Sequence, residues 1–336
     1  MNKVKFCLVG AGRAGMVDAR NFEFNIEESE MVAVVDPNEK NGKEAAKELR
    51  AEYFVDFKEA QNNIDFDAVC IGAPTFVHAG AILEAAKAEK HIFTEKPLSI
   101  TVDEAQKIEK AVKKNNVKFQ IGFMRRFDEN FLRAKKLIEE GAIGEPTLIK
   151  SVGRGPGLPP EWYADISKSN GLLAEVNSHD FDSMRWLIGS EFKEIYAVAD
   201  NFKVDDYKDK YPGFYDTVAA TVKFENGVLG TVDGCCPATY GYDARVEILG
   251  TEGMLMIGAK EKNSVLVWNK EQEIVQDGNT SWRALFKDAY LAEANHFIDC
   301  VINDKKPKVN EMDGKKAVEI VVAGNKSIQE KRPVKL

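Results

Sequence analysis

Short apolar runs alternate with stretches of helical spacing over the first 122 residues. The apolar runs are residues 3–10, 31–36, 67–74, 91–97 and 118–123. The helical stretches between them include residues 38–52, 79–90 and 103–116. Strands that alternate with helices in this way predict an α/β fold with a parallel, doubly wound sheet.

The pattern changes to pairs of alternating strands after residue 122. Asn226-Gly227 lies between two such runs within residues 218–234, which predicts a hairpin. Further strands are expected over residues 244–250, 253–259 and 264–269. We therefore expect two domains, residues 1–122 with the doubly wound sheet and residues 123–336 with an α+β fold. A sheet face that helices leave open favours self-association.

Residues 171–189 combine apolar residues at near-helical spacing with Gly189 as a stop signal, so one helix is expected there. On such a helix Glu175 and His179 are four residues apart and share a face. The pair is either a surface contact that stabilises the helix or an acid/base device. Upstream, residues 151–171 are rich in Gly and Pro and predict a loop, in which Trp162 and Tyr163 are candidates for a pocket wall.

Composition narrows the class of protein. The chain has 336 residues, 44% hydrophobic and 30% charged, which is enough for two domains with separate cores. Its formal net charge is −8, and an acidic balance argues against a nucleic-acid partner, which needs a clustered basic face. No apolar segment approaches the roughly 20 residues that cross a bilayer, so no membrane partner is expected.

The cysteines and the first residues indicate the cellular compartment. The five cysteines form no CxxC pair and are interpreted as reduced packing residues. The apolar run at the start is too short for an export signal. We therefore expect a cytoplasmic protein. No group of His, Cys and carboxylates has metal-ligand spacing, so no metal is expected.

The first turn carries the sequence GAGRAG, residues 10–15, between a strand and a helix. Gly10 suits a tight turn, Gly12 suits close approach of the backbone to a pyrophosphate, and Gly15 suits close helix packing. Asp36 follows 21 residues after Gly15, where an acid accepts hydrogen bonds from an adenosine ribose. The candidate dinucleotide-binding residues are Gly10, Ala11, Gly12, Arg13, Ala14, Gly15 and Asp36. An acid at this point favours NAD over NADP.

Ligands of a doubly wound sheet bind at the carboxyl ends of its strands. The loops at these ends provide further candidates for cofactor contacts, which are Ala73, Pro74, Thr75, His78, Glu95 and Lys96. Lys96 is the most specific of these candidates, because a primary amine beside a nicotinamide is suited to hold a substrate hydroxyl. Arg126, in the loop after residue 122, either holds a substrate oxygen or pairs with Asp128.

Several of these segments together resemble the Gfo/Idh/MocA oxidoreductases, with inositol 2-dehydrogenases as the most similar members. The segments are GAGRAG, Asp36, GAPTFVHA (72–79), TEKPLS (94–99), GFMRRFD (122–128), HDFDSMRWLIG (179–189) and YGYD (240–243). The resemblance implies a Rossmann domain and a second α/β domain whose large, mainly antiparallel sheet mediates dimers or tetramers. It also implies NAD(P)-linked oxidation or reduction of a sugar or cyclic polyol.

The resemblance places the family lysine on Lys96 and the catalytic histidine on His179. The acid four residues before that histidine is usually Asp, whereas this chain has Glu175 and an unfamiliar Val-Asn-Ser segment that includes Asn177. Tyr240 is placed near the substrate by the YGYD likeness. The expected substrate-binding residues are therefore Lys96, Arg126, Trp162, Tyr163, Glu175, Asn177, His179 and Tyr240.

The chemistry that fits these residues is oxidation of a secondary alcohol. An imidazole, with an ordinary pKa near 6.5, takes the hydroxyl proton near neutral pH, while the Lys96 ammonium stabilises the developing alkoxide and Glu175 orients the ring. Two other functions stay open: a glycosidase or lyase that oxidises a glycoside transiently with bound NAD, and a nucleotide-sensing regulator without turnover. The expected partners are a polyol or sugar and further copies of the chain, as a homodimer or homotetramer.

Overall fold

The computed structural model describes residues 3–158 and 160–336. The chain divides into two compact units, Met1–Phe127 with Asp288–Val318, and Asp128–Lys287 with Glu319–Leu336. A segment near the C-terminus, Asp288–Val318, therefore packs with the first unit.

The first unit is built on a six-stranded sheet in the order β3-β2-β1-β4-β5-β6, with every pairing parallel. Its strands are β1 (Val4–Val9), β2 (Ser29–Val35), β3 (Glu52–Phe54), β4 (Ala68–Ile71), β5 (His91–Glu95) and β6 (Phe119–Gly122). The predicted doubly wound sheet is confirmed, although the short strand β3 was not foreseen. The strand order reverses between β1 and β4, which is where such sheets bind dinucleotides.

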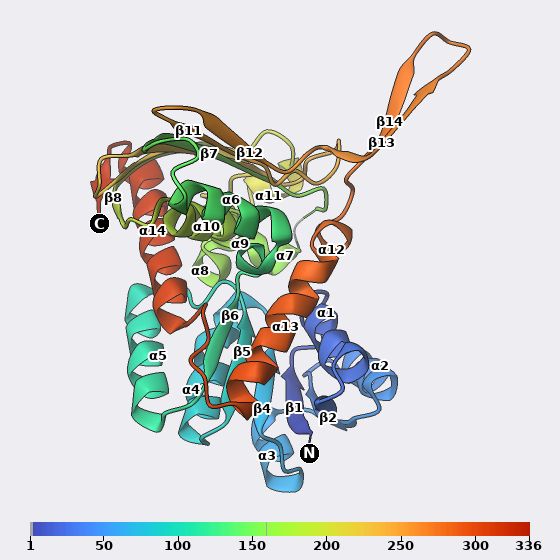
Figure 1. The fold of residues 1–336 in the computed structure, drawn as a ribbon. Helices are drawn as coiled ribbons and strands as arrows, with labels where there is room; N and C mark the ends of the chain where they lie inside the picture. The colour runs from blue at the N-terminus through green and yellow to red at the C-terminus, as the bar shows by residue number, and fades with distance from the viewer. Residues whose placement is uncertain (1–2, 159) are drawn as a thin grey trace. The chain divides into compact units, whose positions relative to one another are not determined.

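The first unit also contains helices, most of which connect these strands. They are α1 (Gly15–Arg20), which continues as the π-helix η1 (Asn21–Asn25), α2 (Glu39–Leu49), α3 (Phe57–Asn63), α4 (Thr75–Lys87), α5 (Val102–Asn115), the 3-10 turn η2 (Met124–Phe127) and α13 (Lys287–Ile302). Figure 1 shows α4 and α5 on one flank of this unit and α1 and α2 on the other. The start of α5 is fixed by a capping box between Thr101 and Glu104.

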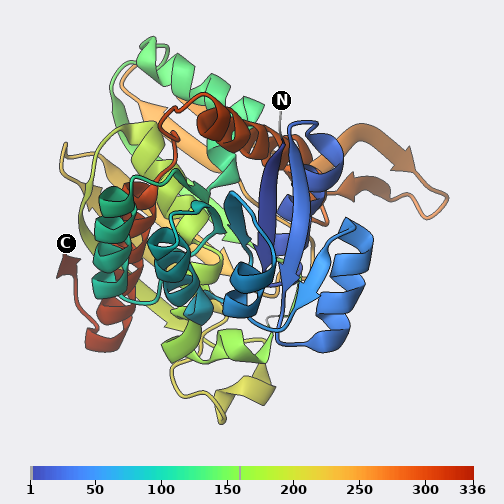
Figure 2. The same ribbon diagram turned by 90° about the horizontal axis from the view of Figure 1, so that it is seen from below.

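The core of the first unit explains why α13 belongs to it. Phe297 of α13 lies 6.0 Å from Phe6 and 5.7 Å from Phe93 between ring centroids, and Phe6 stacks on Phe22 at 4.1 Å. All four side chains are fully buried. Figures 1 and 2 both show α13, in orange-red, beside the N-terminal strands.

The second unit contains a seven-stranded sheet in the order β12-β11-β7-β10-β9-β8-β15. Its strands are β7 (Pro146–Arg154), β8 (Phe192–Asp200), β9 (Thr217–Phe224), β10 (Leu229–Cys235), β11 (Val246–Gly250), β12 (Met254–Ile257) and β15 (Val334–Lys335). Every pairing is antiparallel except that of β7 with β10. The predicted, mainly antiparallel sheet is confirmed, and the hairpin turns at Asn226-Gly227, where Gly227 has φ +92°.

The helices of the second unit are α6 (Glu129–Glu139), α7 (Glu161–Ala164), α8 (Ile166–Ser169), α9 (Gly171–Glu175), α10 (Ser178–Ile188), α11 (Asp205–Lys208) and α12 (Trp282–Leu285). A further helix, α14 (Glu311–Glu330), has residues in both units. The expected loop over residues 151–171 is therefore wrong where α7 and α8 form, and its residue 159 lies outside the described residues.

One face of the large sheet is covered and the other is open. Helix α10 packs against β7 and α9 against β9 and β10, and buried and exposed residues alternate along β9. Large apolar side chains are exposed on the strands, namely Tyr196, Val198, Leu229, Leu249, Met254 and Met256. A separate hairpin of β13 (Glu261–Trp268) and β14 (Ile274–Gly278) projects away from this sheet (Figure 1). Within the described residues, no helix combines the length and the apolar character that a bilayer crossing requires.

Candidate functional site

The glycine-rich loop between β1 and α1 is held by backbone contacts that leave no room for side chains. A Cβ on Gly10, which has φ +91°, would lie 2.5 Å from the Cα of Ala73. A Cβ on Gly15 would lie 2.5 Å from the Gly10 carbonyl oxygen, and one on Gly72 would lie 2.2 Å from the Gly15 Cα. The loop after β1 and the loop after β4 therefore pack together because these glycines lack side chains.

Gly12 differs from the other two glycines of this loop. It is exposed, and a Cβ there would meet only the Gly72 carbonyl oxygen, at 3.5 Å. Arg13 beside it is exposed, and Ala14 precedes the first residue of α1. The accessible backbone at Gly12 is the feature that close approach of a pyrophosphate requires.

Asp36 follows β2 and is bonded to this loop. Its Oδ2 accepts a hydrogen bond from the Ala11 backbone N–H at 2.9 Å, and its Oδ1 accepts one from the Asn38 N–H at 2.8 Å. A carboxylate oxygen has two lone pairs, so each oxygen keeps acceptor capacity for a ribose hydroxyl. The residues at this strand end fit a dinucleotide such as NAD.

The loop after β4 is joined to the loop after β5 through His78. This ring is 1% exposed; its Nδ1 lies 2.6 Å from the Pro97 carbonyl oxygen and its Nε2 lies 2.8 Å from that of Ala73. Burial lowers the pKa of His78, which favours the neutral ring, and a neutral ring donates to only one of these carbonyls. Pro74 and Thr75 begin α4 beside this contact, and Thr75 is buried.

Lys96 follows the end of β5, and its backbone N–H donates to Glu95 Oε2 at 3.1 Å. The Lys96 residue is partly exposed, whereas Glu95 is 3% exposed. Contacts with Glu95 and His78 thus fix the backbone at Lys96 and at Pro97. The Lys96 amine is therefore carried by a rigid segment at the end of β5.

Arg126 pairs with a different acid from the one expected. Its Nη2 lies 3.0 Å from Asp313 Oδ1 on α14, and both side chains are about nine-tenths buried. Asp128 instead accepts the N–H groups of Asn130 and Phe131 and caps α6. The alternative that Arg126 pairs with Asp128 is therefore wrong, because Asp128 bonds at its own helix start.

Glu175 and His179 lie on two helices instead of one. Glu175 is the last residue of α9, and His179 is the second residue of α10. The chain leaves the helical path at Val176, where φ is −114°, so the expected continuous helix is wrong at this point. The i, i+4 argument for a shared helix face no longer applies to the pair.

Asn177 explains where this break occurs. Its side chain is 0% exposed, and its Nδ2 donates to Asp180 Oδ2 at 2.8 Å. A Cβ on Gly234 of β10 would lie 2.1 Å from Asn177 Oδ1, and one on Gly153 of β7 would lie 2.8 Å from its Nδ2. The amide fills the space above two sheet glycines, a position that favours a structural role over the expected contact with substrate.

Two aromatic residues of α7 lie upstream of α9. Tyr163 is 4% exposed, and within the described residues its hydroxyl has no hydrogen-bond partner. Burial raises the pKa of Tyr163, and the neighbouring Cys236 and Glu175 raise it further. The electrostatic effect of Glu175 shows that Tyr163 and this acid are neighbours within the second unit, while Trp162 is partly exposed.

Tyr240 belongs to a polar network that the sequence did not reveal. It lies in the turn before β11 and is 52% exposed; its hydroxyl donates to Asp243 Oδ2 at 2.8 Å and accepts from Arg154 Nη1 at 3.2 Å. Arg154 Nε also donates to Asp233 Oδ1 at 2.6 Å. The signal available in the sequence was the position of Arg154 at the end of a strand, between Gly153 and Gly155.

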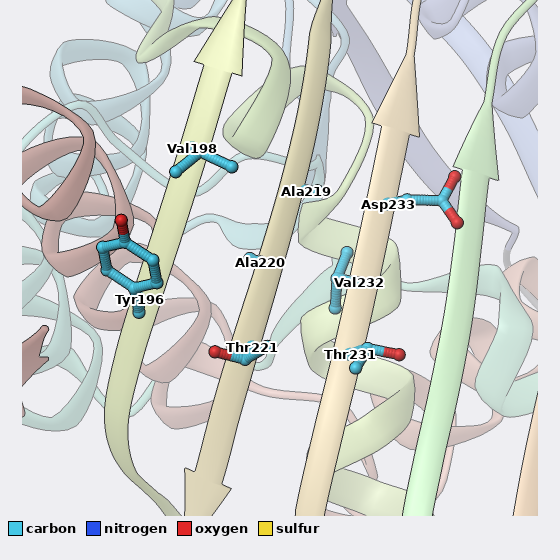
Figure 3. A pocket seen from close by; sticks show the side chains of 8 residues that line it. All are labelled: Tyr196, Val198, Ala219, Ala220, Thr221, Thr231, Val232 and Asp233. Atoms are coloured by element: carbon cyan, nitrogen blue, oxygen red, sulfur yellow. The ribbon is translucent and has the colours of Figure 1, made fainter. Parts of the chain in front are cut away.

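A shallow hollow of about 280 Å³ lies on the large sheet, and none of the residues that line it is a predicted site residue. Figure 3 shows its lining on the neighbouring strands β8, β9 and β10, with Tyr196 and Thr221 at one end and Val198 and Asp233 at the other. No group of three or more His, Cys, Asp or Glu within residues 3–158 and 160–336 is arranged to hold a metal ion.

The strand order of the first unit, its glycine-rich loop and Asp36 define a dinucleotide-binding protein. Comparison with family models makes this specific: residues 4–123 match the NAD-binding Rossmann fold of the Gfo/Idh/MocA oxidoreductase family, and residues 135–336 match its C-terminal alpha/beta domain. The chain belongs to this family, as the sequence indicated, and it is an oxidoreductase with an NAD-binding domain.

Two curated relatives cover nearly the whole chain. It is 32% identical over 330 residues to myo-inositol 2-dehydrogenase of Thermotoga maritima, covering 98% of this chain and 97% of the relative. It is 32% identical over 342 residues to scyllo-inositol 2-dehydrogenase (NAD(+)) of Bacillus subtilis, covering 100% and 97%.

Solved structures of inositol dehydrogenases are also similar to this chain along its whole length. A myo-inositol 2-dehydrogenase of Lactobacillus plantarum aligns with a TM-score of 0.92 at 28% identity, covering 100% of both chains. The scyllo-inositol dehydrogenase of Lactobacillus casei with bound NAD(H) and scyllo-inositol aligns with a TM-score of 0.90 at 30% identity, covering 99% of both chains.

Proposed function

We propose that this oxidoreductase is an NAD-dependent dehydrogenase that oxidises a secondary hydroxyl of a cyclic polyol or sugar. The observation that carries the proposal is the similarity to inositol dehydrogenases along 98–100% of the chain, which includes both domains of the family. The preference for NAD rests on Asp36, because its carboxylate repels the 2′-phosphate of NADP.

Three side chains carry the proposed chemistry. His179 takes the proton of the substrate hydroxyl, Lys96 donates to the same oxygen and stabilises the developing alkoxide, and Glu175 orients the imidazole and binds a neighbouring hydroxyl. Bound NAD supplies the hydride acceptor. Glu175 has one methylene more than Asp, which moves its carboxylate by about a bond length and changes which hydroxyl it meets.

Further residues are proposed to bind the substrate around these three. They are Arg126, Trp162, Tyr163 and Tyr240, with Asn177 supporting the segment between Glu175 and His179. Tyr163 is a neighbour of Glu175, and Tyr240 presents a half-exposed hydroxyl fixed by Asp243 and Arg154. Cyclic polyols expose many hydroxyls, which such donors and acceptors are suited to bind.

A spectrophotometric panel tests this function. The purified chain is mixed with NAD and, in turn, with inositol isomers, glucose, galactose and aryl glucosides, and the absorbance of reduced cofactor is followed. Formation of NADH with a polyol or sugar supports the proposal. Cleavage of an aryl glucoside without net NADH indicates the glycosidase alternative, and NAD binding without any turnover indicates the regulator.

A variant pair tests the proposed base. His179→Ala is expected to lower turnover by about 10²-fold or more. The control is His296→Gln, because His296 Nε2 accepts the Lys308 N–H at 3.1 Å and the glutamine carbonyl retains an acceptor. Equal turnover of His179→Ala and the control would remove His179 from the mechanism.

We also propose that the chain assembles as a homodimer or homotetramer through the open face of the large sheet. The strand register aligns Leu148, Leu229, Leu249 and Met254 in one row on neighbouring strands. Leu229, Leu249 and Met254 are 52, 46 and 52% exposed, and an apolar row of this kind is typical of a surface that another protein covers.

A further inference from the structure

Three carboxyl side chains from separate elements of the first unit are neighbours inside its core. Asp18 lies on α1, Glu95 ends β5 and Glu293 lies in α13, and they are 0, 3 and 0% exposed. Asp18 and Glu95 interact electrostatically with each other, and both interact electrostatically with Glu293. We call these three residues the carboxyl cluster.

The carboxyl cluster has almost no hydrogen-bond donors. Within the described residues, both oxygens of Asp18, both of Glu293 and Oε1 of Glu95 have no partner. Among the residues that the structure describes, Oε2 of Glu95 is the one oxygen of the cluster that accepts a bond, from the Lys96 backbone N–H. Ionised carboxylates accept but do not donate, so neighbouring carboxylates bond to each other only when one is protonated. Protons therefore supply the donors that this arrangement lacks.

Other titratable groups face the cluster from two elements. Burial raises the pKa of the Cys70 thiol on β4, and repulsion from the three carboxyls of the cluster and from Cys7 of β1 raises it further. The positive charge of the Lys96 ammonium attracts the carboxylate of Glu95. One ammonium opposite three carboxylates leaves a net negative charge in an apolar core, which is costly.

Burial raises the pKa of all three acids. Repulsion from Glu95 raises the pKa of Asp18 further, and repulsion from Asp18 and Glu95 raises that of Glu293. For Glu95 burial outweighs Lys96, which lowers its pKa. The folded cluster therefore keeps protons at a pH where exposed carboxyls have lost them.

We propose that the carboxyl cluster is a proton store coupled to NAD binding, and that loss of its protons weakens binding. Asp18 lies three residues after Gly15 of the glycine-rich loop, and Glu95 accepts the N–H of Lys96. The cluster therefore joins two segments that form the proposed cofactor edge. Ionisation adds negative charge in a low-dielectric core near a cofactor that carries two phosphates, and it pushes α1, β5 and α13 apart. The proposal rests on the NAD-binding role of the first unit and not on the substrate.

The test measures the dissociation constant for NAD by calorimetry between pH 6 and 9. In the native chain the constant is expected to increase with pH, by up to about tenfold per pH unit for each coupled proton. Asp18→Asn and Glu293→Gln remove ionisable groups with little change in shape and are expected to flatten this dependence. Asp288→Asn, an exposed acid on α13, is the control and keeps the native dependence.

Proton uptake on binding gives a second readout. NAD binding to the native chain, measured in buffers of different ionisation enthalpy, is expected to take up protons above neutral pH, and less uptake is expected in Glu293→Gln. The same pH dependence in the native chain and both variants, or binding without proton uptake, would overturn the proposal. Absence of NAD binding would overturn the cofactor assignment as well, whereas pH-coupled binding without polyol turnover supports the cluster and contradicts only the substrate.

Discussion

The carboxylate of Asp36 accepts the backbone N–H of Ala11, with 2.9 Å between Oδ2 and the nitrogen. This bond joins the end of β2 to the glycine-rich loop between β1 and α1, two segments that are adjacent in the sheet. Asp36 therefore has two roles in the proposed function, since it shapes the loop that approaches the pyrophosphate and offers its remaining lone pairs to the ribose.

Asp36→Ala is expected to weaken NAD binding. Loss of a hydrogen bond to a charged group costs about 1.5–3 kcal/mol, which corresponds to an increase of roughly 10- to 150-fold in the dissociation constant. NADP binding is expected to change less, because the repelling carboxylate is also lost. Fluorescence titration with both cofactors measures the two constants. Asp56→Ala is the control, since Asp56 accepts a backbone N–H at the start of α3. An unchanged NAD constant would contradict both roles of Asp36.

Gly15→Ala is expected to destabilise the first unit and abolish tight NAD binding. The added Cβ would lie 2.5 Å from the Gly10 carbonyl oxygen and 3.1 Å from the Gly72 Cα, and backbone atoms cannot move aside cheaply. Overpacking of this kind costs about 1–3 kcal/mol. Gly80→Ala in α4 is the matched control, because its Cβ would have no atom within 4 Å, and a gain of up to about 1 kcal/mol is expected. Urea unfolding and NAD titration distinguish the two variants, and equal stability would refute the steric argument.

The sequence predicted the parts of the molecule that depend on local pattern. Alternation of strands and helices gave the parallel sheet, and Asn226-Gly227 gave the hairpin between β9 and β10. The GAGRAG segment predicted a tight loop, because the positive φ of Gly10 and the close packing of Gly15 are properties of single residues. These features need no knowledge of distant contacts.

Features that depend on distant partners could not be predicted in this way. Arg126 pairs with Asp313, which is 187 residues away, instead of with nearby Asp128. The helix break after Glu175 depends on an amide that fills space above glycines of two other strands. The burial of Glu293 in the carboxyl cluster could not be predicted either, because a helical pattern shows which residues share a face but not what that face contacts.

Asn177→Ala tests whether the residue at this helix break is structural. Removal of the amide leaves a void above Gly153 and Gly234 and takes a donor from Asp180, so the free energy of unfolding is expected to fall by about 1–3 kcal/mol. The Michaelis constant for the substrate is expected to change less than in Tyr240→Phe, which removes a proposed contact. A large increase in the Michaelis constant with unchanged stability would instead make Asn177 a substrate ligand.

Leu249→Glu tests the proposed assembly. Leu249 is 46% exposed in the apolar row on the open face of the sheet, and a carboxylate there is costly to bury in an interface of two copies. Light scattering after size exclusion is expected to show the native chain as a dimer or tetramer and the variant as smaller species. The control is Val55→Glu, because Val55 is 50% exposed but belongs to the first unit. Val198→Glu on β8 is expected to act like Leu249→Glu, since Val198 is also exposed on this sheet. A native chain that is already monomeric, or an unchanged mass in both sheet variants, would show that the open face is not the interface.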